Sequence, residues 1–423
     1  MSVRSALQWV GHELVRPRGP VSHRFYRGSR RSRAGVALLL AISAILLLAV
    51  LVTEVAHGAV VRAQLAAQHR DEVKAEALAY SGVHFYRMIL MASMAIGRNP
   101  MVSQIAATMG FNATELWQAI PYIDTRFMRL LFVTDGRADE GDVEDAVAQG
   151  GLSDAQVEAS RQGSSLLNRP FLDFDGDFNA SVKDEDRLIY VGKMQAENMG
   201  ELLLIPAAAQ IMAMFSTEEA VDYVNANNLV REELIGNLAD WTDADDTRAY
   251  QGGSEDALYQ RLDPPYRAKN APFDTKQEIR LVDGWHLDGV WRIVGQHLTI
   301  YGSGKVNVNT ASKEVLYGLL WANREGGITE STINEALAEF LSLRGRPLAD
   351  GGLYIATGAQ FEGFFENTFN IQLNDNIKEQ VTTQSKVFRI TSAGEVGTAR
   401  VEIQTVIDFS SNPAGNTLFW RVR

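Results

Sequence analysis

One uncharged apolar run near the N-terminus constrains this chain more than any other feature. Val36–Val52 reads VALLLAISAILLLAVLV, and at about 1.5 Å per residue such a helix comes close to crossing a hydrocarbon layer of about 30 Å. A cleaved secretory signal has a shorter apolar part, about 7–15 residues long, before a small-residue cleavage site. The run here is longer and no A-x-A pattern clearly follows it. We therefore expect a retained membrane anchor over residues 36–56.

The charge on either side of this run predicts its orientation. Residues 1–35 contain eight arginines and a single acidic residue, Glu13, whereas the whole chain of 423 residues carries a net charge of −12. A basic segment before the anchor and an acidic body after it indicate a cytoplasmic N-terminus. We expect a single-pass protein of the inner membrane whose C-terminal domain is periplasmic.

The helix is expected to continue beyond the membrane. Val60–Ile96 has no proline and is dominated by good helix formers. This predicts one helix over Val36–Gly97 that ends near Pro100, with residues 57–100 as its periplasmic part. The second half should pack on a globular head, and an apolar stripe at three-, four- or eight-residue spacing indicates its amphipathic character. That stripe comprises Leu65, Val73, Ala77, Tyr80 and His84.

Five sequence blocks further along the chain carry a family resemblance. They read LADWTDAD (Leu238–Asp245), GGSEDALY (Gly252–Tyr259), PPYRAKN (Pro264–Asn270), QEIRLVDG (Gln277–Gly284) and KVNVNTASKEVL (Lys305–Leu316). In this order and spacing, and together with the apolar N-terminal helix, they resemble the large minor pseudopilin K of the type II secretion system, the GspK family. The resemblance covers most of the chain after residue 30.

The resemblance implies that the N-terminus is processed. Residues 1–35 would be a basic leader, which prepilin peptidase removes by cutting between Gly35 and Val36, and Val36 would then be N-methylated. Most pilins have a glutamate at the fifth mature position, where this chain has Leu40; the K member of the family is known to lack that acid. Because an unpaired carboxylate is costly in hydrocarbon, Leu40 suits a subunit that has no other subunit ahead of it.

The element pattern and the resemblance together predict an α+β fold. A pilin-like long N-terminal helix would pack on an antiparallel sheet, with a large inserted α-helical domain. The first part of the pilin-like α/β domain is expected at 101–195, the inserted domain at 196–350 and the C-terminal strands that complete the sheet at 351–423. The expected strands are a region around Phe171–Phe178, Ile189–Val191, Val401–Phe409 and Thr417–Val422, with a turn at Ser392–Gly397. The expected helices are Ala207–Asp240, residues 311–324 with Asn309 or Thr310 as N-cap, and residues 329–344.

The densest group of oxygen ligands lies in the first two blocks. It comprises Asp240, Asp243, Asp245, Asp246, Glu255 and Asp256. Calcium takes about six to eight hard oxygen ligands, and the bend at Gly252–Gly253 lets backbone carbonyls contribute. The resemblance implies calcium binding in the helical domain, and we place it on this block. The alternative is a solvated acidic loop that caps helices through Asp243 and Ser254.

A second set of acidic residues matches part of an EF-hand loop. Asp173, Asp175, Asp177, Asn179 and Asp184 stand at loop positions 1, 3, 5, 7 and 12. The glycine, however, is Gly176 at position 4, whereas the sharp turn requires position 6. The flanking residues also look like strands rather than helices. A polar hairpin between strands is therefore favoured over a second metal site.

Catalytic interpretations find little support. The chain has no cysteine, which excludes thiolate metal sites and cysteine nucleophiles, and its seven histidines form neither HExxH nor HxH. No GxSxG is present, so a membrane-tethered hydrolase has no visible catalytic group. Asn307–Ser312 resembles the opening of a helix–hairpin–helix DNA-binding module, but such modules need basic surroundings and the exported part is acidic.

We therefore expect a non-enzymatic minor pseudopilin of the type II protein secretion system. It would form the tip or initiation complex of the periplasmic pseudopilus with the other minor pseudopilins, of I and J type. The resemblance also implies the major pseudopilin and the inner-membrane secretion platform as partners, and prepilin peptidase as the processing enzyme. The alternatives are a minor pilin of a type IV pilus system or a helix–hairpin–helix DNA-binding membrane protein.

Overall fold

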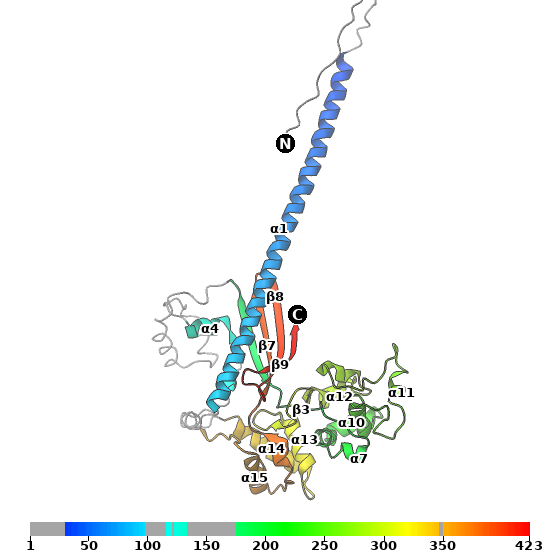
Figure 1. Cartoon of the computed structure of the whole chain (residues 1–423), viewed down its shortest axis with the longest axis vertical. Coiled ribbons are helices and arrows are strands. Elements are labelled where there is room, and N and C mark those ends of the chain that lie inside the picture. Colours follow the sequence, from blue (N-terminus) through cyan, green and yellow to red (C-terminus); the bar gives the residue numbers. More distant parts are fainter. Residues whose placement is uncertain (1–29, 98–115, 121, 133–174, 347–349) are drawn as a thin grey trace, which may run out of the picture. The chain divides into compact units, whose positions relative to one another are not determined.

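The structure is a computed structural model that describes residues 30–97, 116–120, 122–132, 175–346 and 350–423 (Figure 1). Contacts divide the chain into two units, Met1–Ala67 and Gln68–Arg423. The described helices are α1 (Arg30–Gly97), α3 (Leu116–Ala119), α4 (Thr125–Phe132), α7 (Met199–Leu202), α8 (Pro206–Met214), α9 (Glu218–Ala226), α10 (Arg231–Asp240), α11 (Asp256–Tyr259), α12 (Asp288–Ile293), α13 (Lys313–Asn323), α14 (Glu330–Arg344), α15 (Gly358–Phe369) and α16 (Ile377–Gln380), with 3₁₀ turns η3 (Lys276–Leu281) and η4 (Gly295–His297). The described strands are β1 (Tyr122–Asp124), β2 (Asp177–Asp184), β3 (Ile189–Tyr190), β4 (Leu298–Thr299), β5 (Val306–Asn307), β6 (Val381–Thr382), β7 (Val387–Val396), β8 (Ala399–Asp408) and β9 (Asn416–Val422).

The N-terminal helix is continuous. α1 runs from Arg30 to Gly97 without a break, so the predicted single helix is confirmed, while its predicted end near Pro100 lies outside the described residues. In the first unit its apolar side chains are exposed; Leu39, for example, is 71% exposed. Among the described residues this is the one helix long and apolar enough to cross a membrane. Because a large exposed apolar surface is unfavourable in water, α1 is consistent with a single-pass membrane anchor.

In the second unit the C-terminal part of α1 packs on a sheet. The buried side chains on this helix recur every three or four residues and include Ala75, Ala79, Val83, Tyr86 and Leu90. The predicted apolar stripe does not make this contact, because all five of its members are exposed: Leu65, Val73, Ala77, Tyr80 and His84. The prediction that the second half of the helix packs on a globular part is confirmed, but the residues that pack are different.

Glycine and alanine decide which face of α1 packs. A Cβ at Gly394 in β7 would lie 2.0 Å from the Ala75 carbonyl oxygen and 2.8 Å from the Ala79 nitrogen. On the helix side, a Cβ at Gly82 would lie 2.3 Å from Ser392 Oγ. The helix and strand backbones therefore approach closely only because these positions lack side chains. A face that carries Val73 or Tyr80 cannot come as near.

The same contact corrects the turn predicted at Ser392–Gly397. β7 continues to Val396, so Gly394 belongs to a strand and makes room for α1 instead of forming a turn. The turn into β8 is shorter and includes Gly397, whose φ of +58° suits glycine. The alternating segment predicted at Val401–Phe409 is confirmed as β8, and the predicted last strand is confirmed as β9.

The sheet shows where the helical segment is inserted. Its strand order is β1-β2-β7-β8-β9, with every neighbouring pair antiparallel. β2 pairs with β7 over the whole length of β2, although the chain leaves β2 after Asp184 and returns only at Val387. The insertion is thus longer than the predicted 196–350, and α15 and α16 lie in the segment 351–423 where strands were expected. The predicted α+β fold with an inserted helical part is confirmed.

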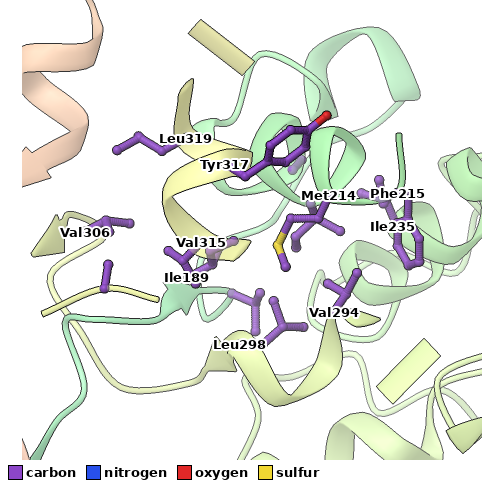
Figure 2. Packing of buried hydrophobic residues seen from close by; sticks show 14 of the residues in the cluster. Ile189, Met214, Phe215, Ile235, Val294, Leu298, Val306, Val315, Tyr317 and Leu319 are labelled. Carbon is purple, nitrogen blue, oxygen red and sulfur yellow. The ribbon is translucent and has the colours of Figure 1, made fainter. Parts of the chain in front are cut away.

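The inserted segment has its own hydrophobic core (Figure 2), to which Ile189, Met214, Ile235, Val294 and Val315 contribute. Gly318 lets α13 pack closely on α8, because a Cβ there would lie 3.0 Å from the Gln210 carbonyl oxygen. The predicted helical stretch Ala207–Asp240 comprises α8, α9 and α10. The predicted N-cap of α13 is wrong: Ser312, not Asn309 or Thr310, accepts the capping hydrogen bond, from the Val315 N–H.

Candidate metal centre

Three acidic side chains from separate positions meet in the inserted segment. Asp240 is the last residue of α10, Asp243 lies in the loop that follows, and Glu255 is the N-cap residue of α11. One oxygen of each carboxylate lies within 4.8 Å of the others. The three residues are 2%, 8% and 1% exposed, respectively. The geometry confirms that part of the predicted acidic block converges on one point.

The local fold explains why these carboxylates meet. Trp241, which follows α10, is buried and donates from Nε1 to Glu278 Oε1 at 3.0 Å, so the end of α10 is held against the core. The loop then turns back through Gly252 and Gly253, whose φ values of +70° and +93° favour glycine. An isolated antiparallel bridge between Thr247 and Ser254 closes this loop. It brings Glu255 back beside Asp240.

Most oxygens of this cluster have no hydrogen-bond partner among the residues that the structure describes. Asp240 Oδ1 accepts from the Ala249 N–H at 2.8 Å, but Asp240 Oδ2, Asp243 Oδ1 and both Glu255 carboxylate oxygens are buried and have no partner in the described part of the chain. Buried carboxylates that are neither paired nor hydrogen-bonded are costly. A divalent cation with oxygen preference would satisfy these atoms, so the residues fit the calcium ion that the family resemblance implies.

The electrostatics of the cluster agree with this fit. Burial and the neighbouring carboxylates raise the pKa of Asp243 to about 7 and that of Glu255 to about 8. Burial raises the pKa of Asp240 to about 6, although the Ala249 N–H and Arg248 act in the opposite direction. Each shift reflects negative charge that the surrounding protein does not compensate. A cation bound by these three carboxylates would therefore be electrostatically favourable.

The other members of the acidic block have different partners. Asp245 Oδ1 accepts from the Thr247 N–H at 2.7 Å, and Asp246 Oδ1 accepts from Asn270 Nδ2 at 3.1 Å. Asp256 Oδ1 accepts from the Ala268 N–H at 3.2 Å, and its other oxygen lies 3.6 Å from Arg267 Nε. The converging set is thus narrower than the predicted one. Asp245 still acts on it at a distance, because its charge contributes to the raised pKa of Asp243.

Comparison with known proteins identifies the segment that carries this cluster. Residues 208–295 match the family model described as "Type II secretion system (T2SS), protein K". Over these residues the chain is similar to the T2SS protein K family. The matched residues include Asp240, Asp243 and Glu255, so the candidate metal centre lies within the protein K segment. The resemblance drawn from the sequence blocks is confirmed.

A similar solved structure is titled "The Crystal Structure of the GspK-GspI-GspJ complex from enterotoxigenic Escherichia coli Type 2 Secretion System". The sequence identity is 16% and the TM-score 0.42, and the alignment covers 67% of this chain and 98% of the other. Among curated proteins, no match was found.

The second predicted metal site is not assembled by the structure. Asp173 lies outside the described residues, and Asp175 forms an ion pair with Lys74 at 2.9 Å. Asp177, Asn179 and Asp184 all belong to β2, so the first and last of them stand about 23 Å apart along an extended strand. They cannot share one ion. The polar hairpin that we favoured there is also wrong for Asp177–Asp184, because these residues form a single strand.

The residues predicted for processing lie on α1 in the first unit. Val36 and Leu40 are 59% and 66% exposed. A Cβ at Gly35 would meet no atom within 4 Å, so this glycine is not required for packing. These positions leave the predicted peptidase site accessible, and cleavage between Gly35 and Val36 stays a prediction.

Sequence reasoning missed a buried acidic junction where the chain leaves the sheet. Asp184, Glu185 and Asp186 are each 3% exposed or less. Asp186 Oδ2 accepts from the backbone N–H groups of Lys386 and Val387 at 2.8 and 3.2 Å. Asp184 accepts from the hydroxyl of Ser385, and Glu185 forms an ion pair with Arg389. The junction ties the exit from β2 to the return into β7.

Side chains of the segment that resembles a helix–hairpin–helix opening lie at the same junction. Asn307 Nδ2 donates to Ser385 Oγ at 2.6 Å, and Asn309 Nδ2 donates to the Ile355 carbonyl oxygen at 2.9 Å. Both side chains therefore point at protein groups. The sequence does show three consecutive acids at Asp184–Asp186 and an Asn-rich block at Asn307–Asn309. No local pattern, however, indicates that these two distant segments meet in the fold.

Proposed function

We propose that this chain is a non-catalytic minor pseudopilin of the type II secretion system. The supporting observation is that one chain combines a T2SS protein K segment with a long helix whose residues Val36–Val52 are exposed and apolar. Prepilin peptidase would cut between Gly35 and Val36, after which Val36 is N-methylated. The T2SS family match favours this function over a minor pilin of a type IV pilus.

The exposed helix supplies the force for assembly. In a membrane, helices associate through close packing of small and aliphatic residues rather than through exclusion of water. α1 offers Ala41, Ser43, Ala44 and Ala49 for this contact, and Ser43 Oγ already donates to the Leu39 carbonyl oxygen at 2.8 Å, so it adds no unsatisfied donor. Side-by-side pairing with the I- and J-type minor pseudopilins would form the initiation complex in the inner membrane, to which the major pseudopilin and the platform are added.

Leu40 supports a place at the tip. In pilin assembly the acid at this position pairs with the N-terminal amine of the subunit ahead. Leu40 has no such charge, so this chain neither needs nor attracts a subunit ahead of it. The pseudopilus would therefore begin with this protein, and its periplasmic part would belong to the end that meets the secretion channel first.

We also propose that Asp240, Asp243 and Glu255 hold a calcium ion. When bound, calcium supplies the positive charge that these buried carboxylates lack. The ion would tie the end of α10 to the start of α11, and backbone carbonyls or water would complete its coordination. Its role is structural: the cation stabilises the loop Trp241–Ser254 instead of taking part in a reaction.

Substitution at the processing site tests the function. In Gly35→Leu the leader should remain attached, and neither the I-type nor the J-type pseudopilin should co-purify with the full-length protein from detergent-solubilised inner membranes. Gly58→Leu is the matched control, because Gly58 lies on the same exposed helix and an added Cβ comes no nearer than 3.7 Å to another atom. Normal processing of Gly35→Leu would refute the cleavage site. A processed wild-type protein that needs no detergent for extraction would refute the anchor.

A further inference from the structure

A polar cleft of about 510 Å³ lies between four helical elements of the inserted segment. Its walls come from the start of α9, the end of α12 with η4, the start of α13 and the start of α14. The side chains on which its chemistry depends are Glu218, Glu219, Arg292, Glu314, Tyr317 and Glu330. The cleft is separate from the candidate metal centre, whose residues do not line it. Its size falls within the range of about 300–1,000 Å³ that is typical of ligand sites.

Helix N-termini at this cleft do not make it an anion site. The starts of α9, α13 and α14 are capped by Thr217, Ser312 and Thr329, each of which accepts a hydrogen bond from a backbone N–H. Each helix also has a glutamate in its first turn. At each of these helix starts one backbone donor is therefore satisfied by the cap, and the glutamate offsets the partial positive charge before any ligand arrives.

The charged groups of the cleft leave negative charge unpaired. Four glutamates outnumber Arg292 and Lys313, and Arg292 already forms an ion pair with Glu219. His297 lies 3.3 Å from Ser312 Oγ, and burial lowers its pKa, so it adds no positive charge near neutral pH. Among the residues that the structure describes, Glu218, Glu314 and Glu330 form no ion pair. The unmatched groups at this cleft are thus mainly carboxylates.

Tyr317 supplies an independent sign of a missing ligand. The residue is 3% exposed and its ring stacks on Trp321, with centroids 5.6 Å apart. Its hydroxyl is buried and has no hydrogen-bond partner in the described part of the chain. In Figure 2 this hydroxyl points away from the aliphatic side chains of the core. Buried polar groups normally have a partner, so this hydroxyl has the capacity to bond a group that is not among the described residues.

We propose that the cleft binds the arginine side chain of an extended segment of a partner protein. A guanidinium group has five N–H donors in a planar arrangement, which can be shared between two carboxylates and a hydroxyl oxygen. Glu314, Glu330 and Tyr317 provide these three acceptors at one cleft. The cleft is also larger than one guanidinium, which leaves space for the main chain and a neighbouring side chain. This site requires neither the calcium ion nor the membrane anchor.

Peptide binding to the full-length protein in detergent tests this site. The probe is a fluorescent Ala-Arg-Ala peptide with acetylated and amidated ends, followed by fluorescence anisotropy, and the matched peptide has citrulline in place of arginine. Citrulline keeps the shape but removes the charge. We expect the arginine peptide to bind and the citrulline peptide to bind at least about tenfold more weakly, because hydrogen bonds to a charged group are lost. Free arginine amide should compete, but more weakly than the peptide.

Substitutions then locate the binding. Glu314→Gln with Glu330→Gln should weaken binding of the arginine peptide about tenfold, and Tyr317→Phe should weaken it less while leaving the arginine preference intact. The control is Glu335→Gln with Glu339→Gln on exposed positions of α14 outside the cleft; far-UV circular dichroism spectra at the assay temperature should match for all variants. The proposal is overturned if the arginine and citrulline peptides bind equally well, or if the control pair weakens binding as much as Glu314→Gln with Glu330→Gln. Competition by inorganic phosphate at the same site would also overturn it.

Discussion

Glu255→Gln should have opposite effects on stability with and without calcium. In the structure Glu255 is 1% exposed, and neither of its carboxylate oxygens has a hydrogen-bond partner among the described residues. Without calcium, Glu255 of the wild type must either take up a proton, because its pKa is raised to about 8, or stay an unfavourable buried charge. The substitution removes this cost at nearly constant shape. The variant should therefore melt at the same temperature as the wild type or slightly higher in the presence of a chelator. With calcium, the same change removes a charged ligand and should cost stability.

The expected size follows from binding linkage. Calcium in about 100-fold excess over its Kd stabilises the wild type by about 2.7 kcal/mol, which raises its melting temperature by roughly 5–11 °C. Loss of a charge-assisted contact costs about 1.5–3 kcal/mol and raises Kd about 10–100-fold. At the same calcium concentration, the remaining stabilisation in Glu255→Gln is about 0.4–1.4 kcal/mol. The calcium-dependent shift should thus fall to about half or less.

Differential scanning calorimetry of the full-length protein in detergent measures both effects, with calcium and with a chelator at the same pH. Glu335→Gln is the control: it makes the same chemical change at an exposed position outside the metal centre. The control should keep the full calcium shift. An unchanged calcium shift in Glu255→Gln would refute the metal centre. A chelator-treated variant that melts several degrees below the chelator-treated wild type would refute the argument that Glu255 is an unfavourable charge without the ion.

Two further predictions concern the sheet and the junction. Gly394→Val should lower the free energy of unfolding of the second unit in urea by more than about 2 kcal/mol, because even a Cβ would lie 2.0 Å from the Ala75 carbonyl oxygen. The control is Gly327→Val, which should change this free energy little because a Cβ at Gly327 meets no atom within 4 Å. Equal effects of the two substitutions would contradict the close approach of helix and sheet. Burial, reinforced by Asp186, raises the pKa of Asp184 to about 7, so the folded chain retains a proton that the unfolded chain releases. The free energy of unfolding should therefore fall between about pH 4 and pH 7, by at most about 1.4 kcal/mol per pH unit from this group. Asp184→Asn should make that slope shallower, and an unchanged slope would show that Asp184 is not the titrating group.

Local sequence patterns predicted the elements better than their contacts. The continuous helix, the strand at Val401–Phe409 and the helix of residues 329–344 were all predicted correctly, because periodicity, capping and helix propensity act over a few residues. The packing face of α1 was not, because its strongest apolar spacing runs through Val73 and Tyr80. The face that packs is the one whose small residues match Gly394, and that match depends on a strand more than 300 residues away in the sequence.

The candidate metal centre was predicted in part for a similar reason. The composition of the acidic block showed that oxygen ligands were abundant, but six acids could not be ranked by sequence. The structure selects Asp240, Asp243 and Glu255 because a helix end, a glycine turn and a helix start bring them together. Asp245, Asp246 and Asp256 are neighbours in the chain but satisfy backbone and side-chain donors instead.

The sequence by itself determined that this chain has a membrane-length apolar helix after a basic segment, since length, hydrophobicity and charge are properties of consecutive residues. Its sequence blocks also sufficed to point to the protein K family. Only the tertiary structure decided which face of that helix meets the sheet, which carboxylates share a site and which glutamates line one cleft with Tyr317. These properties depend on distances between residues that are remote in the chain, and such distances exist only once the strands have paired and the helices have packed.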